Sequence, residues 1–320
     1  MANPSAADFL DLLRCPISNT PLTISSVSKL CSATGISYNN SEKAIPMLIR
    51  AELPSETIAQ QRHYEKITGI YQKNLTFPHT KTYHLYLDDA LDKAITHANL
   101  DGGNVEKAVV AEICCGYGEV FQLYKNRISR GVGVDISLSM LHGAIANEYG
   151  KHIIFVQGDA LALPLADNSF DIVFLLGAIH HISDRKSLYE ELWRILKPGG
   201  MIVVREPLDD FFLWRWLRKI IYTVSPALDA VTEHPLRKRD EVIRLEKAGF
   251  ILGDWSTHGF LAYCFFMNSD VLKFNALFRH IPGIKRITRW AASFDSLVLK
   301  MPGLRNAGTQ VVFRASKASQ

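Results

Sequence analysis

Short apolar runs alternate with amphipathic segments through the middle of the chain, and this alternation restricts the fold more than any other feature. Each run has the length of a strand, and the segments between the first five runs carry apolar residues at helical spacing. Strands joined through helices form right-handed crossovers, which produce a parallel sheet covered on both faces. We therefore predict an α/β fold with a seven-stranded, mostly parallel sheet. The predicted strands are 108–114, 131–137, 153–159, 171–178, 201–207, 250–257 and 309–315.

The chain divides into three predicted parts. Residues 1–54 read as short strands and turns and form a small unit, and residues 55–104 contain two amphipathic helices that we expect to cover the functional site. Residues 105–320 form the sheet domain. Segments 208–239 and 258–308 are aromatic and basic insertions into it. Because each follows a strand at the edge where open α/β sheets bind ligands, both are predicted to form a lid around an apolar pocket.

Charge is unevenly distributed along the 320 residues. The whole chain has a formal charge of +4, but residues 205–320 carry 18 lysines and arginines against 11 acidic residues, an excess of +7. Such an excess suits an anionic ligand, a polyanion or a membrane surface. The sequence shows neither the pattern of a signal peptide nor an apolar run of membrane-spanning length. We expect a cytoplasmic protein whose only contact with membranes is peripheral.

The stretch "AEICCGYGEVF" (111–121) places Gly116 and Gly118 directly behind a predicted strand and before a helix. Glycines here let a ligand approach the backbone, and the helix N-terminus offers free N–H groups. Asp135 ends the next strand, nineteen residues after Gly116, where a carboxylate can bind both hydroxyls of a ribose. Asp159 ends the third strand and is placed to meet an adenine amine. These residues are predicted to meet in one nucleotide-binding crevice.

Four motifs in order resemble the class I S-adenosylmethionine-dependent methyltransferases, in particular the ubiquinone and menaquinone C-methyltransferase subgroup. They are "VVAEICCGYGEVF", "GVGVDISLSML", "VQGDALALPLADNSFDIVF" and "LWRILKPGGMIVVREP", within residues 105–257. The resemblance implies a Rossmann-like sheet and S-adenosyl-L-methionine as the cofactor. It also implies that the cofactor is bound by Glu112, Gly116, Gly118, Asp135, Ile136, Asp159, Ala160 and Gly177.

The first motif departs from the family pattern. Glu112 takes the position of the usual aspartate, Cys114 replaces a glycine and Tyr117 replaces a threonine. Cys115 stands where the family often has cysteine. We interpret both cysteines as small buried side chains without a redox role.

Two histidines follow the fourth strand in "GAIHHISD". His181 and His180 lie next to the expected position of the transferable methyl group. Histidine can remove a proton near neutral pH, so both are candidates for a base or an acceptor contact, with a structural role as the alternative.

The N-terminal unit resembles a small zinc-ribbon that accompanies some methyltransferases, but in a degenerate form. The ribbon has two Cys-x2-Cys pairs, whereas this chain has Cys15 with Ser18 and Cys31 with Thr34. Serine and threonine are poor zinc ligands, so no metal is expected.

These observations favour an enzyme of small-molecule biosynthesis that methylates C or O of a lipophilic or aromatic acceptor. Two alternatives remain open at this point: an RNA base methyltransferase, and a non-catalytic cofactor-binding scaffold protein. Nucleic acid is the less favoured partner, because the N-terminal part is acidic and the ribbon is degenerate. Residues 1–204 carry 18 basic and 21 acidic side chains.

Overall fold

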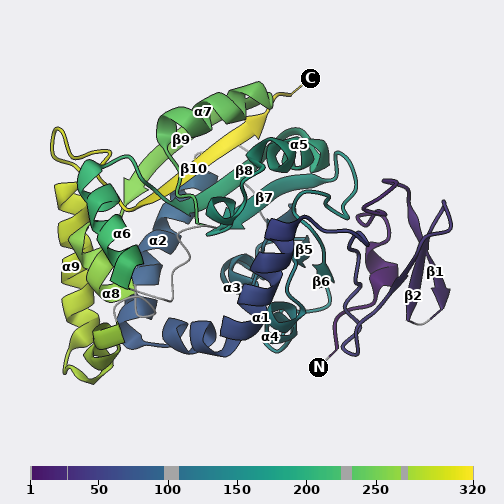
Figure 1. Cartoon of the computed structure of the whole chain (residues 1–320), viewed down its shortest axis with the longest axis horizontal. Helices are drawn as coiled ribbons and strands as arrows, with labels where there is room; N and C mark the ends of the chain where they lie inside the picture. Colours follow the sequence, from purple (N-terminus) through teal and green to yellow (C-terminus); the bar gives the residue numbers. More distant parts are fainter. Residues whose placement is uncertain (1, 27, 97–107, 225–232, 268–272, 320) are drawn as a thin grey trace.

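The computed structural model describes residues 2–26, 28–96, 108–224, 233–267 and 273–319. Its centre is a seven-stranded sheet in the order β6-β5-β4-β7-β8-β10-β9 (Figure 1). Strands β4 to β8 pair in parallel, and β10 runs antiparallel to both of its neighbours. The prediction of a mostly parallel, Rossmann-like seven-stranded sheet is confirmed. The strands are β4 (Val109–Ile113), β5 (Arg130–Asp135), β6 (Ile153–Gln157), β7 (Phe170–Leu176), β8 (Leu196–Pro207), β9 (Phe250–His258) and β10 (Gln310–Lys317).

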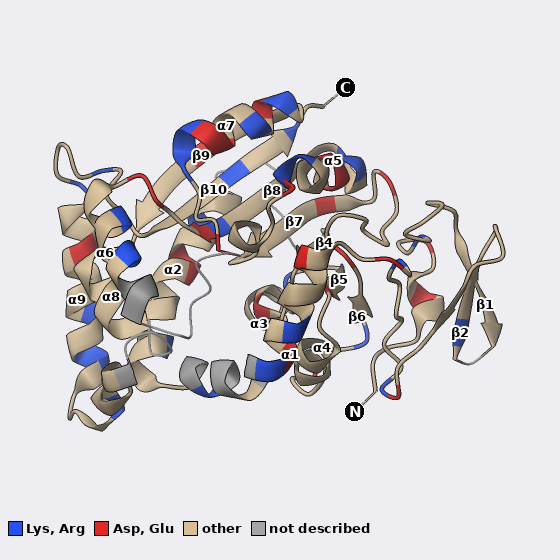
Figure 2. Cartoon of the chain, in the orientation of Figure 1, with Lys and Arg blue, Asp and Glu red and all other residues tan. Residues whose placement is uncertain are grey.

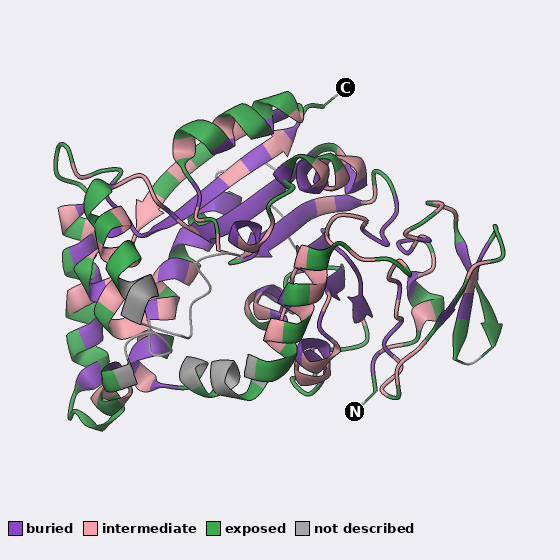
Figure 3. Cartoon of the chain, in the orientation of Figure 1, coloured by how far each residue is buried: buried purple, intermediate pink, exposed green. Residues whose placement is uncertain are grey.

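Alternate residues of the central strands enter two different hydrophobic cores, which is why these runs are apolar throughout. On β7, Val173 and Leu175 join one core, whereas Ile172 and Phe174 join the other. Helices cover both faces, so strands β4 to β7 are almost entirely buried (Figure 3). One core receives α5 (Arg185–Ile195) and α7 (Lys238–Lys247). The other receives α2 (Pro78–Thr96), α3 (Glu119–Tyr124) and α4 (Leu138–Ile145).

Strand β8 begins earlier than predicted. The segment "LKPGG" precedes the predicted strand 201–207, but β8 starts at Leu196, which pairs with Phe170. The register then shifts before Ile172 pairs with Met201. Gly199 lies in this irregular segment and has a φ of 79°, which glycine adopts without strain.

The N-terminal unit covers the β6 edge of the large sheet. It contains the 3-10 helix η1 (Ala6–Phe9) and an antiparallel sheet of β1 (Leu22–Ser26), β2 (Lys29–Ser32) and β3 (Ser37–Asn39). The side chain of Asn3 donates to the carbonyl of Phe155 at 2.7 Å and accepts from its N–H at 3.0 Å. The N–H of Leu48 donates to the carbonyl of Gln157. The edge strand is therefore protected from pairing with another chain, and residues just after Leu48 are brought to the sheet's carboxyl end.

Hydroxyl groups join the two positions where the ribbon resemblance would place metal ligands. Thr34 donates to Ser18 at 3.2 Å, Cys31 lies 3.1 Å from the Ser37 hydroxyl, and the buried Cys15 sulfur lies 3.0 Å from the Tyr38 hydroxyl. These contacts join the ribbon positions through hydroxyl and thiol side chains.

We predict that the purified protein holds no stoichiometric zinc. Two thiols cannot complete a tetrahedral structural site, and the partner positions are hydroxyls already hydrogen-bonded to one another. Elemental analysis of protein purified without chelators checks this, with Cys15→Ser as the matched variant. One zinc per wild-type chain, lost in Cys15→Ser, would contradict the prediction.

Helix α1 (Ser55–Leu75) and helix α2 follow the N-terminal unit and approach the carboxyl edge of the sheet (Figure 1). Behind α2 lie α8 (Leu261–Met267), the 3-10 helix η5 (Lys273–His280) and α9 (Ile284–Val298), while α6 (Phe212–Val224) lies at the same end of the molecule. Asp295 of α9, which is fully buried, accepts hydrogen bonds from the Tyr83 hydroxyl and from the N–H groups of Phe260 and Ala262. The second insertion therefore supports α2. None of the described helices is both long and apolar enough to cross a bilayer.

Candidate active site

A cavity of about 540 Å³ lies at the carboxyl edge of the parallel strands. Its sheet side is formed by the ends of β4, β5, β6 and β7, and its opposite wall by α1 and α2. This is the edge at which open α/β sheets bind ligands, and the volume is in the range of a small-molecule site. Among the predicted site residues, the lining includes Glu112, Gly116, Asp135, Ile136, Asp159, Ala160, Gly177 and His181.

The loop after β4 exposes backbone to this cavity at Gly116. A Cβ atom there would meet nothing within 4 Å, and its φ of 49° favours glycine. Gly118, in contrast, is outside the lining, and a Cβ on it would lie 3.1 Å from the side chains of Phe155 and Tyr149. Cys114 has a φ of 54°, a left-handed conformation that glycine adopts more readily than cysteine. Gly116 thus opens the loop to a ligand, while Gly118 allows the loop to pack.

Two acidic side chains of β4 and β5 border the loop. Asp135 accepts from the N–H of Gly116 at 2.8 Å and from the N–H of Ser137 at 2.8 Å. Burial raises the pKa of Asp135 to about 6, although these two hydrogen bonds oppose the shift. Glu112 is buried: one carboxyl oxygen accepts from the Val120 N–H, and the other has no hydrogen-bond partner within the described residues. Burial also raises the pKa of Glu112 well above its ordinary value.

Asp159 has a partner that the sequence did not reveal. Arg50, which belongs to the N-terminal unit, donates to one carboxylate oxygen of Asp159 at 2.5 Å. The N–H of Leu161 donates to the other oxygen at 3.0 Å. The two side chains are 109 positions apart in sequence. Arg50 therefore connects the N-terminal unit to the cavity wall.

The histidine pair has two different environments. The ring Nδ1 of His180 lies 2.7 Å from the buried carboxylate of Glu206, and His180 is outside the cavity lining. His181 lines the cavity, and its Nε2 lies 2.6 Å from the Tyr64 hydroxyl of α1. Burial, followed by the neighbouring His180, lowers the pKa of His181 well below the usual value for histidine. His181 is therefore neutral at pH 7 and faces the cavity.

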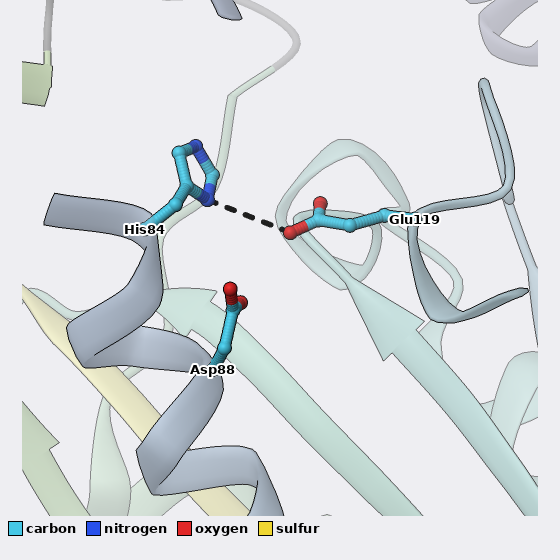
Figure 4. A group of neighbouring side chains, drawn as sticks. All are labelled: His84, Asp88 and Glu119. Carbon is cyan, nitrogen blue, oxygen red and sulfur yellow. Dashed lines mark ion pairs between the residues drawn. The ribbon is translucent and has the colours of Figure 1, made fainter. Parts of the chain in front are cut away.

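A second polar group lies on the opposite wall. His84 and Asp88 stand one turn apart on α2 and face Glu119 at the start of α3 (Figure 4). One ligand atom from each lies within 4.8 Å of the others, and all three residues line the cavity. His84 Nδ1 is 3.5 Å from Glu119 Oε1, and Arg205 Nη2 of β8 is 2.9 Å from Glu119 Oε2.

The charge of Arg205 determines whether His84, Asp88 and Glu119 could bind a cation. Its second terminal nitrogen, Nη1, lies 3.8 Å from Asp88 Oδ1, too far for a hydrogen bond. Burial, with the like charge of Glu119, raises the pKa of Asp88 to about 6. Because the guanidinium already compensates one of the two carboxylates, the group fits a hydrogen-bonding polar end of the cavity better than a cation site.

Comparisons with known proteins agree with this fold. Residues 111–204 match the family model described as "Methyltransferase domain".

Residues 111–204 thus carry a methyltransferase domain.

The methyltransferase domain is 33% identical over 108 residues to a demethylmenaquinone methyltransferase of Roseiflexus castenholzii, covering 32% of this chain and 45% of the relative. It is 26% identical over 175 residues to a ubiquinone/menaquinone biosynthesis C-methyltransferase of Campylobacter jejuni, covering 47% of this chain and 74% of the relative. The chain thus spans less than half the length of the first of these relatives.

Among solved structures, a chain in the Haloferax volcanii complex of the Trm112 methyltransferase activator shares the fold. The TM-score is 0.55 with 17% sequence identity, covering 81% of this chain and 98% of that one.

The residues present fit S-adenosylmethionine, the cofactor of this class of methyltransferases. Gly116 leaves open space beside its backbone, and the buried Glu112 offers a carboxyl oxygen without a partner, as a ligand with an amino group requires. Asp135 has lone pairs left beyond its two accepted hydrogen bonds.

The described parts of both insertions do not line this cavity, which differs from the prediction that they would form its apolar pocket. The wall facing the sheet comes instead from α1 and α2, and α8 and α9 pack behind α2. Residues 225–232 and 268–272 of these insertions lie outside the described chain. Their position after two strands and their aromatic composition predicted that the insertions would pack, but could not identify the element they pack against.

Proposed function

We propose that the protein transfers the methyl group of S-adenosylmethionine to C or O of a lipophilic or aromatic small molecule. The observation that carries this proposal is the convergence of Gly116, Asp135 and Asp159 on one cavity at the ends of β4, β5 and β6. Named relatives that act in menaquinone and ubiquinone biosynthesis support a lipophilic acceptor. The domain boundaries we propose are 1–54, 55–104 and 105–320.

For the cofactor, we propose a role for each predicted residue along the sheet side of the cavity. Glu112 and Gly116 receive the amino-acid end, with Gly118 fixing the loop, and Asp135 accepts from the two ribose hydroxyls. Ile136 packs on the adenine, which Asp159 and the Ala160 backbone contact at its edge. Gly177 borders the sulfonium. Arg50 supports this assignment by holding Asp159 in place from outside.

When bound, S-adenosylmethionine supplies an activated methyl group, so positioning of the acceptor contributes much of the catalysis. The mainly apolar lining includes Leu85, Leu123 and Leu176, which suits a hydrophobic acceptor. We propose that His181 contacts this acceptor and that Asp88 takes the proton of its hydroxyl group. The deprotonated oxygen, or the ring carbon that shares its electrons, would be the nucleophile for the methyl group that S-adenosylmethionine supplies, with the electron pair of the S–C bond remaining on sulfur. Methylation at carbon would also release the proton of that carbon to water. His180, held by Glu206, positions the turn of His181.

The proposal is tested with methyl-labelled S-adenosylmethionine and three acceptor sets: reduced short-chain naphthoquinones and benzoquinones, catechols, and RNA oligonucleotides. Labelled product from a hydroxylated ring, with formation of S-adenosylhomocysteine, supports it. Labelling of RNA alone would replace it with the RNA alternative. Binding of S-adenosylhomocysteine without turnover on any set would favour the scaffold alternative.

We predict that Asp88→Asn lowers kcat about 100- to 1000-fold, the size expected for loss of a general base. With wild-type protein, kcat should rise with pH through about 6, because Asp88 accepts a proton only when ionised. The variant should lose this rise and keep its affinity for S-adenosylhomocysteine.

Asp89→Asn is the matched control, since Asp89 stands next in the same helix, is exposed, and pairs only with Lys93 among the ion pairs of the described residues. It should behave as wild type. If Asp88→Asn keeps both kcat and its pH dependence, then Asp88 is not the base, and His181 becomes the remaining candidate.

We also propose that the acceptor reaches the protein from a membrane, which the protein contacts peripherally.

A further inference from the structure

Helix α9 has two apolar faces, and only one of them is used in packing. Ile284, Thr288 and Ala292 are buried, and Ala292 packs in a cluster with Tyr83 and Leu87 of α2. The other face carries a second apolar row that is exposed to solvent. It consists of Ile287 (42% exposed), Trp290 (66%), Phe294 (53%) and Leu297 (64%), with Met301 (53%) just beyond the end of the helix, and is called here the α9 stripe.

The α9 stripe follows helical geometry. Its four members on α9 are three or four positions apart, so they lie in one row along the helix surface, and Met301 follows shortly after the helix ends. Each of the five side chains is at least 42% exposed, whereas scattered single apolar residues are normal on a protein surface. A contiguous row of this kind indicates an interaction surface.

The helix before α9 extends the apolar surface. On η5, Phe274 is 51% exposed and Leu277 is 66% exposed, and Ile281 just after it is 41% exposed. η5 packs against both α2 and α9. The exposed apolar residues of η5 and α9 therefore lie together at one end of the molecule, far from the N-terminal unit (Figure 1).

Basic side chains accompany the α9 stripe. Residues 273–305 contain seven lysines and arginines and one acidic residue, Asp295, which is fully buried and receives hydrogen bonds inside the protein. The exposed Lys285, Arg286 and Arg289 lie on the helix turns that carry Trp290. Figure 2 shows basic residues along α9. Arg286 also lies over the Trp290 ring, 5.2 Å from its centroid. Exposed carboxylates are absent from this segment, so it would not repel a negatively charged surface.

We propose that the α9 stripe docks the protein on an anionic lipid membrane, with α9 lying parallel to the surface. Apolar and tryptophan side chains would enter the boundary between headgroups and acyl chains, while the flanking lysines and arginines contact anionic headgroups. The charge of the segment favours this partner over a second copy of the same basic surface. Membrane docking rests on the proposed function, because a lipophilic acceptor would be found in a membrane. Vesicle binding requires neither cofactor nor acceptor, so membrane docking and methyl transfer can be disproved separately.

The test is co-flotation of the full chain with vesicles of phosphatidylcholine alone and of phosphatidylcholine with 30% phosphatidylglycerol, where roughly one lipid in three is anionic. Wild type should float with the anionic vesicles, less so at high salt, and little with the neutral ones. Trp290→Ser/Phe294→Ser should lose at least tenfold in partitioning. Ile251→Ser, at a residue 61% exposed on β9, is the matched apolar control and should bind as wild type.

Charge variants and the oligomeric state distinguish membrane docking from a contact between copies of the chain. Arg286→Gln/Arg289→Gln should weaken anionic-vesicle binding and reduce its salt dependence. Failure of wild type to float with anionic vesicles overturns the proposal. It is also overturned if wild type forms a dimer that Trp290→Ser/Phe294→Ser dissociates, because the α9 stripe would then be a contact between copies.

Discussion

Replacing Asp135 with alanine is expected to weaken binding of S-adenosylhomocysteine by about 2–4 kcal/mol, or roughly 30- to 700-fold. The physical reason is the loss of a buried carboxylate that can accept two charge-assisted hydrogen bonds from the ribose. Its place at the end of β5, facing the cavity, leaves no other described acidic side chain of that strand to replace it. Titration calorimetry measures the effect.

The same carboxylate predicts a pH dependence. Burial raises the pKa of Asp135 to about 6, so its acceptor form is present above that pH and is lost as pH falls below it. Affinity of the wild-type protein for S-adenosylhomocysteine should therefore fall as the pH is lowered through about 6, and Asp135→Asn should lack this dependence.

Two controls make the Asp135 result decisive. Asp135 also accepts from the N–H groups of Gly116 and Ser137, so thermal unfolding of each variant must show that the loop remains folded. Asp135→Asn keeps one carbonyl acceptor and should be the milder variant. Unchanged affinity in a folded Asp135→Ala protein would remove Asp135 from the cofactor site.

The sheet side of the cavity could be predicted because it depends on local order along the chain. Strands β4, β5 and β6 are consecutive and neighbours, so residues that end them meet at one edge whatever the rest of the chain does. Asp135 and Asp159 could thus be placed together from their spacing alone. The roles given to them stay predictions until ligand binding is measured.

The opposite wall could not be predicted, because its members meet only through tertiary packing. His84 and Asp88 have the one-turn spacing of a helix face, but Glu119 belongs to a different element, and nothing in the sequence aligns the two. Arg50 reaches Asp159 only because the N-terminal unit attaches to the edge of β6. Long-range contacts of this kind leave no periodic pattern in the sequence.

A second large effect is expected at Glu206, a fully buried side chain at the end of β8. Its carboxylate accepts from the N–H of Ala178 at 2.6 Å and from the N–H of Ile179 at 2.7 Å, and it faces the ring of His180. Glu206→Ala would leave these two donors buried without partners. At about 1–3 kcal/mol for each, we expect unfolding free energy to fall by roughly 3–5 kcal/mol.

The conservative variant Glu206→Gln separates folding from positioning. Glutamine keeps one carbonyl acceptor for the turn but places an N–H₂ group where the second oxygen stood, so η4 (Ile179–His181) should shift. We expect a folded protein whose kcat falls about tenfold or more, because His181 moves relative to the acceptor while Asp135 is untouched. Affinity for S-adenosylhomocysteine should stay within about twofold.

Urea unfolding of both variants, with kcat and S-adenosylhomocysteine affinity of Glu206→Gln, tests this role. Glu190→Ala is the control, because Glu190 is exposed and pairs with Lys186 one turn away, and its loss should change stability by less than about 0.5 kcal/mol. A Glu206→Ala protein as stable as this control would show that the buried N–H groups find other partners. Equal losses of kcat and cofactor affinity in Glu206→Gln would show that Glu206 supports the whole cavity, and not the histidine turn in particular.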